Sequence, residues 1–362
     1  MQQRSPFFAV IELFVYFAIP VIWIHREGLI HSMKMSELLI VRLGLMSTIL
    51  CLPGIASAAD ALLAVKVEND IIAADSDGHY SNGIEVAYSF VPDKTHWTRA
   101  MAEGLGWSAA NLDVASYRFG HQIYTPDDIE IASLIEDDRP YAGLAYAGLS
   151  IFQSRDQGQW RDSRAWHMDL GLVGPGAGAE RFQRAVHRAT GSDEPKGWDN
   201  QLENEPFFNM AYGQRWWRQS QLGPLELEYG PALGVAVGNL YTYASSGLGL
   251  RFGKGLARSL GLPSINPGYG SGVYFEPGQS FAWFGYVNLD GRYMAHNMLL
   301  DGNTFSNSHS VDREQWVGDL QAGIALTWDR WQVSFASVWR TREFKGQTEP
   351  DQFGSLVVSR AF

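Results

Sequence analysis

Five oxygen-bearing side chains crowd the start of one strand-like stretch of the sequence. The stretch VENDIIAADSDGHYSNGIEVAYSF holds Glu68, Asn69, Asp70, Asp75 and Asp77 ahead of a run that alternates apolar with small or polar residues. Carboxylate and amide oxygens are ligands of hard cations such as Ca²⁺ and Mg²⁺, whereas Zn²⁺ takes more His or Cys. The stretch therefore predicts an oxygen-lined cation site near the end of a strand.

The fragment DSDG within this stretch is a weaker candidate for cation binding than the Asn-Asp pair before it. Gly78 lies at the wrong offset for an EF-hand loop, and no glutamate completes the ligand set. For Asp75 and Asp77 we therefore favour a solvated turn. For Asn69 and Asp70, which stand at a strand end, we favour the cation-binding interpretation.

A helix is predicted in a segment that interrupts the surrounding strand-like pattern. Residues 174–206 open with Gly and Pro, and a helix is expected from Ala179 to Thr190, closed by Gly191. Helical spacing puts Gln183 and His187 on one face, and imidazole is a base that works near neutral pH. A polar histidine on a helix surface is the simpler alternative. The neighbouring apolar stripe consists of Phe182, Val186 and Ala189.

Most of the remaining sequence alternates with the period of a β-strand. In FAWFGYVNLDGRY, Phe281, Val287 and Leu289 share one parity while Asn288 and Asp290 take the other. Charges on one face and aromatic residues on the other are typical of a transmembrane β-barrel with lipid outside and a polar lumen. The pattern predicts an all-β, transmembrane antiparallel β-barrel with the short helix in an extracellular loop. A soluble β-sandwich is the alternative, because alternation does not say which face meets water.

About twelve strand-like runs can be counted, an even number that suits a single-chain bacterial barrel. The sequence also ends in Phe362, as outer-membrane barrels commonly do, although Arg360 stands where an apolar residue is more usual. The expected strands lie near 61–68, 79–91, 116–124, 139–154, 163–174, 207–218, 224–237, 246–253, 280–295, 314–328, 331–343 and 352–362.

Composition excludes several classes of protein. The chain is 46% hydrophobic and 13% aromatic, which is too apolar for a disordered chain. Its formal net charge of -11 argues against a general nucleic-acid binder, which would carry a basic face. The single Cys rules out a disulfide framework and a multi-thiolate metal site.

The first 58 residues are predicted to be an N-terminal extension and a secretory signal. From Met33, a charged start and an apolar core lead to Ala56-Ser57-Ala58, so we expect cleavage after Ala58 and an exported domain over 59–362. Residues 7–24 are about as long as a short membrane span. We favour translation from Met33 or Met35, with a true membrane anchor as the alternative.

Five segments together resemble the outer-membrane lipid A 3-O-deacylases of the LpxR type, and they occur in the family's order. The resemblance implies a barrel in the bacterial outer membrane, with lipid A or lipopolysaccharide as the substrate and Ca²⁺ as the cofactor. It also implies removal of the 3'-linked acyloxyacyl chain, at an active site that lies between the barrel wall and a loop helix. The segments are VENDIIAADSDGHYSNGIEVAYS, DDRPYAGLAYAGLS, GPGAGAERFQRAVHRATG, GWDNQLENEP and GNLYTYASSGLGLRFG.

The resemblance assigns roles to particular residues. The family's Asn-Asp pair falls on Asn69 and Asp70, and its hydroxyl residue falls on Ser81 in YSNG. Its catalytic histidine falls on His187, four residues after Gln183. His187 is then expected to remove a proton from the water that attacks the ester, while the cation stabilises the oxyanion and Ser81 orients water or substrate.

Two parts of the family pattern are incomplete or ambiguous. The basic pair before PYAG is half present, as Arg139. The acidic residue after the histidine is either Asp193 or Glu194, and Glu194 joins Asn69 and Asp70 in the expected metal-ligand set.

Two other classes of function remain as alternatives. One is an outer-membrane phospholipase, for which His167 with a nearby serine would be the candidate pair. The other is a non-enzymatic barrel, either a pore or a structural protein. The oligomeric state stays open.

Overall fold

The computed structural model describes residues 61–70, 79–262 and 274–362. The chain divides into two units, Met1–Leu52 and Pro53–Phe362, and every described residue belongs to the second. The expected signal, the cleavage site after Ala58, and both Asp75 and Asp77 lie outside the described residues.

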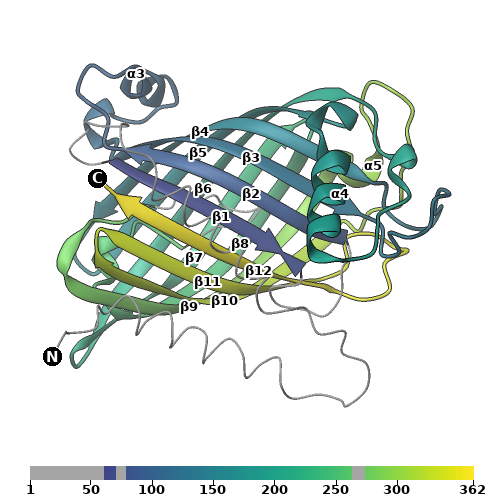
Figure 1. Ribbon diagram of the computed structural model, residues 1–362. Helices are drawn as coiled ribbons and strands as arrows, with labels where there is room; N and C mark the ends of the chain where they lie inside the picture. The colour runs from purple at the N-terminus through teal and green to yellow at the C-terminus, as the bar shows by residue number, and fades with distance from the viewer. Residues whose placement is uncertain (1–60, 71–78, 263–273) are drawn as a thin grey trace, which may run out of the picture. The chain divides into compact units, whose positions relative to one another are not determined.

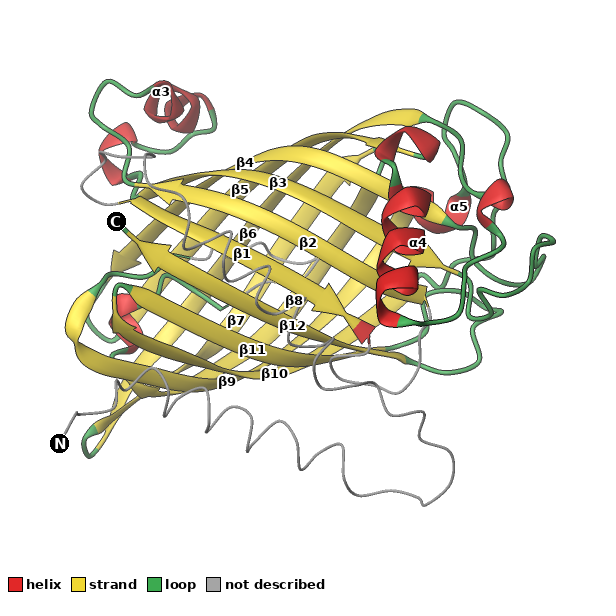
Figure 2. Ribbon diagram, viewed as in Figure 1, coloured by secondary structure: helices red, strands yellow, loops and turns green. Residues whose placement is uncertain are grey.

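In the described part of the chain, twelve antiparallel strands form a closed barrel (Figure 1, Figure 2). Each strand pairs with its neighbours in sequence, and the first strand pairs with the last to close the sheet. The strands are β1 Ala61–Asn69, β2 His79–Phe90, β3 Val114–Thr125, β4 Ala142–Asp156, β5 Trp160–Val173, β6 Glu205–Leu222, β7 Leu225–Gly238, β8 Tyr241–Lys254, β9 Gly278–Asn297, β10 Trp316–Asp329, β11 Trp331–Arg340 and β12 Asp351–Ala361.

The predicted fold class and strand number are confirmed, with differences at some strand ends. The largest is in β8, which begins at Tyr241 rather than near residue 246. The polar and small residues from Thr242 to Gly247 hide the alternation there, but all of them pair with β9 or β7. β11 ends at Arg340, three residues earlier than expected.

Side chains alternate between the two faces of the barrel wall as the sequence pattern predicts. Phe119, Leu170 and Val237 are 64%, 63% and 65% exposed on the outside. Glu228 and Arg292, by contrast, are buried on the inside. Apolar residues outside and charges inside are the arrangement of a barrel surrounded by lipid.

The lumen is filled by paired charges and by residues from the loops. Its buried ion pairs join Arg118 to Glu85 and Asp169, Arg161 and Arg251 to Glu228, and Arg292 and Arg340 to Asp319. Near one end, Tyr274 and Phe275 join a buried cluster with inward residues of six strands. Near the other end, Met298 and Leu299 pack with Tyr80 and Tyr124. Packed side chains therefore occupy the barrel at both ends.

The helices lie in the connections between strands. α4 Ala179–Thr190 matches its predicted bounds, and Gly191 closes it with a φ of 74°. Figure 1 shows α3 and the C-terminus at one end of the barrel and α4 and α5 at the other. Among the described residues no helix is long and apolar enough to span a membrane. The remaining helical elements are α3 Trp97–Gly104, α5 Met298–Asp301, η2 Ala109–Asn111, η3 Pro175–Ala177, η4 Trp198–Asn200 and η5 Leu256–Arg258.

The end that carries α4 is the extracellular end of the barrel. The β5–β6 connection, which contains η3, α4 and η4, is the longest between two strands in the described part of the chain. In outer-membrane barrels the longer loops are extracellular. The predicted placement of the short helix in an extracellular loop therefore fits the fold.

Candidate active site on the outer wall of the barrel

A row of laterally paired residues crosses four strands at the extracellular end. Gly143 of β4 pairs with Ile123 of β3, Ile123 pairs with Asn82 of β2, and Asn82 pairs with Asn69 of β1. The chain neighbours Tyr124, Ala142 and Leu144 belong to a buried cluster inside the barrel, which also contains Tyr80. The Tyr80 hydroxyl donates to Glu68, the neighbour of Asn69, so Glu68 faces the same side. Because side chains alternate along a strand, this row faces outward. Two of its four members are asparagines, on an outer surface that is mostly apolar further along the strands.

A β-bulge in β2 brings further polar groups to this row. The register with β3 shifts between Tyr80 and Asn82, which leaves Ser81 as the extra residue. The Ser81 hydroxyl lies 2.8 Å from the Thr125 hydroxyl, and Asn69 Nδ2 donates to the Ser81 carbonyl oxygen at 2.6 Å. Bulges commonly re-aim side chains beside active sites. Asn69, Ser81 and Thr125 therefore form one hydrogen-bonded group.

Helix α4 packs against the outer wall beside this group. A Cβ added at Gly143 would lie 2.2 Å from the Ala179 Cβ, so the glycine allows the first turn of the helix to approach the sheet. The Phe182 ring lies 5.5 Å from the His121 ring of β3. The buried face of the helix consists of Ala179, Gln183 and His187.

The length of α4 matches the length of the row. Three strand spacings of about 4.8 Å separate Gly143 from Asn69, or about 14 Å in all. The eight helical steps from Ala179 to His187 span about 12 Å of helix. Figure 1 shows α4 lying across the strand ends rather than along them. A helix that starts over Gly143 therefore carries His187 toward the end of the row formed by β1 and β2.

Hydrogen bonds orient the two candidate side chains of α4, Gln183 and His187. His187 Nδ1 lies 2.5 Å from the Asp193 carbonyl oxygen. A carbonyl only accepts, so Nδ1 carries the proton and Nε2 is the basic nitrogen of the neutral ring. Gln183 Oε1 accepts from Trp198 Nε1 at 2.8 Å, whereas the buried Gln183 Nε2 has no hydrogen-bond partner. The side-chain amide of Gln183 thus has a donor available for a ligand.

The acidic candidates occupy different positions. Asp70 directly follows β1 and is only 2% exposed. Asp193 contacts His187 through its backbone carbonyl. Glu194 is largely exposed, and its carboxylate lies 3.8 Å from Arg188. Asp193 is thus the one in contact with the histidine, and a metal-binding role for Glu194 stays a prediction.

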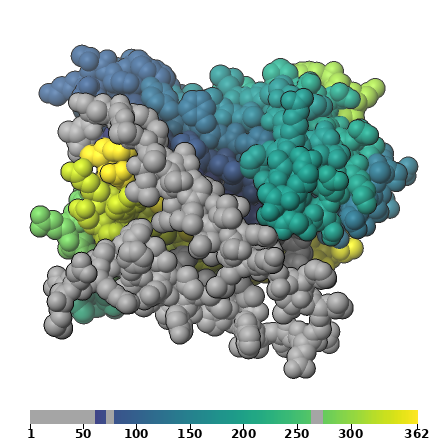
Figure 3. All heavy atoms as spheres, viewed as in Figure 1, coloured from purple at the N-terminus to yellow at the C-terminus, as the bar shows by residue number. Residues whose placement is uncertain are grey.

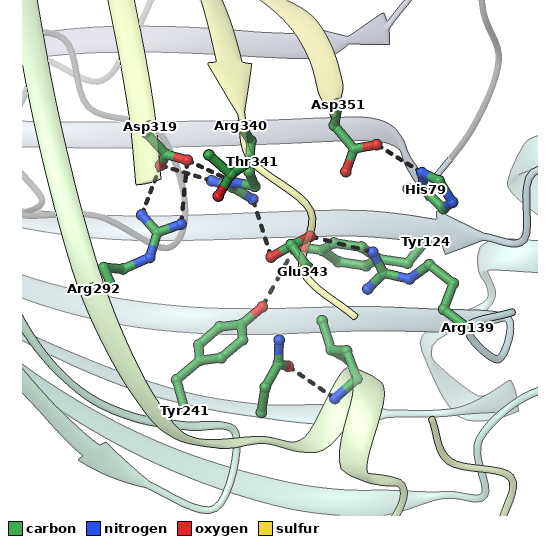
Figure 4. Close-up of polar contacts among 12 residues, drawn as sticks. His79, Tyr124, Arg139, Tyr241, Arg292, Asp319, Arg340, Thr341, Glu343 and Asp351 are labelled. Carbon is green, nitrogen blue, oxygen red and sulfur yellow. Dashed lines mark hydrogen bonds and ion pairs between the residues drawn. The ribbon is translucent and has the colours of Figure 1, made fainter. Parts of the chain in front are cut away.

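Arg139 belongs to a different group of residues, inside the barrel. Its guanidinium lies 4.6 Å from the centre of the inward Tyr124 ring and 3.5 Å from the Glu343 carboxylate (Figure 4). Glu343 also forms an ion pair with Arg340, and Arg340 forms a second ion pair with Asp319. The structure therefore does not bring Arg139 together with the outward group, although the sequence resemblance places both in one site.

Asp138, next to Arg139, is an anchor of the 126–141 loop. Its carboxylate accepts from the backbone N–H of Asp127 at 2.8 Å and lies 3.6 Å from His79 Nε2. Burial alone would raise the pKa of Asp138, but the hydrogen bonds from His79 and from Asp127 lower it below its ordinary value. The ionised carboxylate therefore stabilises this loop.

The donor atoms of the outward group suit a hard cation. Asn69 and Asn82 offer amide oxygens, and the buried Asn82 Oδ1 has no hydrogen-bond partner. Asp70, the residue that follows β1, carries a buried carboxylate next to Asn69 in the sequence. Oxygen donors of this kind are the ligands that Ca²⁺ prefers. Within the described ranges no group of three or more His, Cys, Asp or Glu residues could hold a metal ion. Calcium binding by this group stays a prediction.

Three residues of this region escaped the sequence prediction. Asn82 follows Ser81 in the same motif, but alternation alone puts only one of two consecutive residues outside. Thr125 joins Ser81 only through the pairing of β2 with β3. Trp198 is fully buried and orients Gln183 from a loop fifteen residues further along the chain. The GWDN motif that contains Trp198 was the available signal.

The alternative phospholipase hypothesis requires a serine close to His167, and Ser150 is within hydrogen-bond distance of it. Ser150 Oγ lies 2.7 Å from His167 Nδ1, and the two residues pair across β4 and β5. Both side chains are buried in the lumen, beside the inward Phe152. Lipid lies on the opposite face of the wall, so this pair is not accessible to it.

The fold and the outward polar group define a class of protein. A closed antiparallel barrel with an apolar exterior and charged interior is an integral outer-membrane β-barrel, and this one holds a polar group on its lipid-side wall. A model of the family described as outer membrane protein LpxR matches residues 42–362. The chain therefore belongs to the LpxR family and is located in the bacterial outer membrane.

The solved structure of one LpxR protein agrees with this assignment at the level of the fold. LpxR from Salmonella typhimurium has a TM-score of 0.68 at 18% identity, covering 83% of this chain and 100% of that chain. The β domain of the Bordetella autotransporter Brka has a TM-score of 0.43 at 10% identity, with 84% and 100% covered. The translocator domain of NalP from Neisseria meningitidis has a TM-score of 0.41 at 10% identity, with 90% and 96% covered. A search of curated proteins finds no match.

Proposed function

We propose that this protein is a calcium-dependent lipid A 3-O-deacylase that hydrolyses the 3'-linked acyloxyacyl ester of lipid A. The observation that carries the proposal is the hydrogen-bonded polar group on the outer wall, Asn69, Ser81 and Thr125, beside the helix that holds His187. A polar site on the lipid side of a barrel suits a substrate that never leaves the membrane. Membership of the LpxR family supports lipid A as that substrate.

The side chains support hydrolysis by a general base. His187 Nε2 takes a proton from water, and the hydroxide adds to the ester carbonyl carbon. The alkoxide leaving group then takes the proton back from His187, which restores the neutral ring. Gln183 Nε2 is available to donate to the substrate, and the Ser81 and Thr125 hydroxyls to orient water. Calcium held by Asn69 and Asp70, with Asn82, would supply positive charge near the carbonyl oxygen.

The two rival functions fit the molecule less well. A pore needs an open lumen, whereas packed side chains fill this one at both ends. A serine phospholipase needs a nucleophile that faces lipid, whereas Ser150 and His167 face the lumen.

The decisive experiment is mass spectrometry of lipid A from cells that express the protein or its His187→Ala variant. We expect the wild type to remove one acyloxyacyl unit, with fragmentation locating the loss at the 3' position, and chelation of calcium to stop the reaction in purified protein. Unchanged lipid A together with newly formed lysophospholipid would instead support the phospholipase. No change in either lipid would support the non-enzymatic barrel.

A further inference from the structure

Helix α4 has three distinct faces, of which the buried one belongs to the candidate site. Successive residues are about 100° apart around a helix, so residues three, four and seven apart share a face. An apolar face carries Phe182 and Val186, which are 37% and 39% exposed. A basic face consists of Arg181, Arg184 and Arg188.

The apolar face is directed toward the centre of the membrane. Phe182 lies against His121, which is two residues closer to the membrane centre along β3 than Ile123 of the outward row. The next outward residue along β3 is Phe119, which is 64% exposed to lipid. Phe182 therefore continues the lipid-facing band of the barrel wall.

The basic face is directed away from the membrane centre, because Arg184 follows Phe182 by two residues and so lies about 200° further around the helix. Arg184 Nε lies 3.0 Å from Glu180, and Arg188 lies 3.8 Å from Glu194, with the four side chains 33% to 64% exposed. Exposed ion pairs of this kind contribute little stability, so an anion can compete for the arginines. Figure 3 shows the teal segment that contains α4 on the surface at this end of the molecule.

We propose that α4 lies at the boundary between acyl chains and headgroups of the outer leaflet and recognises a phosphorylated glycolipid. Phe182 and Val186 contact the acyl chains, and Arg181, Arg184 and Arg188 bind the phosphate groups. The face with His187 lies between these two levels, which is the depth at which ester linkages join acyl chains to a sugar. The choice of lipid rests on the proposed function, whereas the depth of the helix does not.

The depth of α4 can be measured with spin labels on the full chain in lipid bilayers, with Cys51→Ser in every variant. A label at Phe182→Cys is expected to collide more with oxygen than with an aqueous nickel chelate, as at Leu170→Cys on the lipid-facing wall. A label at Arg181→Cys is expected to show the reverse, as at Asp312→Cys in an exposed extracellular loop. Nickel accessibility at residue 182 equal to that at residue 312 would overturn the proposal.

Phosphate recognition can be measured without turnover in a His187→Ala background. Native mass spectrometry would compare retention of lipid A, dephosphorylated lipid A and phosphatidylglycerol by the detergent-solubilised barrel. The R181A/R184A/R188A variant should lose at least about tenfold in lipid A retention, since each arginine contributes about a fivefold factor at an anionic surface. The retention of dephosphorylated lipid A should be the same in the triple variant as in the protein that keeps the three arginines. Arg342→Ala, which removes another exposed extracellular arginine, is the matched control and should change nothing.

Three results would refute phosphate recognition by α4. The first is that the triple variant retains as much lipid A as before. The second is that its retention of lipid A and of dephosphorylated lipid A falls equally. The third is that its retention of lipid A and of phosphatidylglycerol falls equally. If the wild type cleaves no lipid A while the arginine effect remains, the proposed function fails and the binding surface stands.

Discussion

A backbone carbonyl orients His187 for its proposed role. The Asp193 carbonyl holds the proton on Nδ1 and so leaves Nε2 as the base. We expect His187→Ala to reduce the rate of deacylation by about 10²- to 10⁴-fold, the usual contribution of a general base. Purified protein in detergent, with lipid A cleavage followed by mass spectrometry, gives the rate.

His96→Ala is the matched control for this prediction. It also removes an imidazole, but from the N-terminus of α3 at the opposite end of the barrel. We expect it to keep full activity. Equal rates for His187→Ala and wild type would rule out α4 as the catalytic element.

Asp70→Asn should fail in a different way from His187→Ala. It preserves the shape of a buried side chain but removes the negative charge that favours a divalent cation. We expect weaker calcium binding and partial recovery of activity at high calcium, whereas His187→Ala should stay slow at every calcium concentration. Calcium titrations of both variants, with binding measured by calorimetry, test this difference. Normal calcium affinity in Asp70→Asn would remove Asp70 from the ligand set.

Asp138 makes the extracellular loop sensitive to acid. Its pKa is lowered in the folded protein, so its contribution to stability is complete above its ordinary pKa of 3.8 and is lost as the pH falls through the lower folded value. We expect the wild type to lose stability below about pH 4. Asp138→Asn should be less stable at neutral pH and less dependent on pH in this range. Urea unfolding in lipid vesicles gives both curves, and parallel curves would count against the prediction.

The sequence predicted part of the candidate site at this scale and missed part of it. Asn69 and Ser81 were found because both lie in one short motif, and the structure joins them by a hydrogen bond. Thr125 was missed because it reaches Ser81 only across a pair of strands, 44 residues away. Arg139 was placed in the site by its motif, but a single charged residue after a turn gives no indication of which side of the wall it will occupy.

At the scale of elements, the approach of α4 to the wall depends on one glycine. Gly143→Val would place a branched side chain where the Ala179 Cβ lies 2.2 Å from a bare Cβ position, so the helix must move outward. We expect a large loss of activity with the barrel still folded, because valine suits a strand. Heat-modifiable migration on gels reports folding, and lipid A cleavage reports activity.

Gly291→Val provides the comparison for this effect. Gly291 also lies in a strand, and a Cβ there meets nothing within 4 Å. Activity should be retained in this variant. If both substitutions left activity intact, close packing of α4 would not be needed for catalysis.

Most of the elements themselves were predictable from the sequence, for a physical reason. A barrel in lipid requires lipid-facing and lumen-facing residues to alternate along every strand. A break in that alternation therefore indicates an inserted helix such as Ala179–Thr190. The β-bulge at Ser81 was not predictable. A single extra residue changes which face the side chains take at one point only, and this leaves the alternation of the rest of the strand unchanged. That bulge brings the serine to the outer wall, so the site was harder to predict than the fold.

At the scale of the whole molecule, the filled lumen has a measurable consequence. Buried ion pairs such as Arg340 with Asp319 line the interior, and loop residues such as Phe275 pack in a buried cluster with inward residues of the barrel wall. We expect no stepwise ion conductance when the purified protein is inserted into a planar bilayer, with a general porin as the positive control. Discrete openings at moderate voltage would show that the lumen opens.

The pairing of β1 with β12 also sets the order in which the protein can mature. Leu62 pairs with Ala361 and Asn69 with Gly354, so contacts between distant parts of the sequence hold both ends of β1. Such distant contacts must wait until the intervening chain has been organised. Asn69 thus gains its second neighbouring strand only when the first and last described strands meet. If Asn69 serves the reaction as proposed, the site is therefore completed by the same step that closes the barrel.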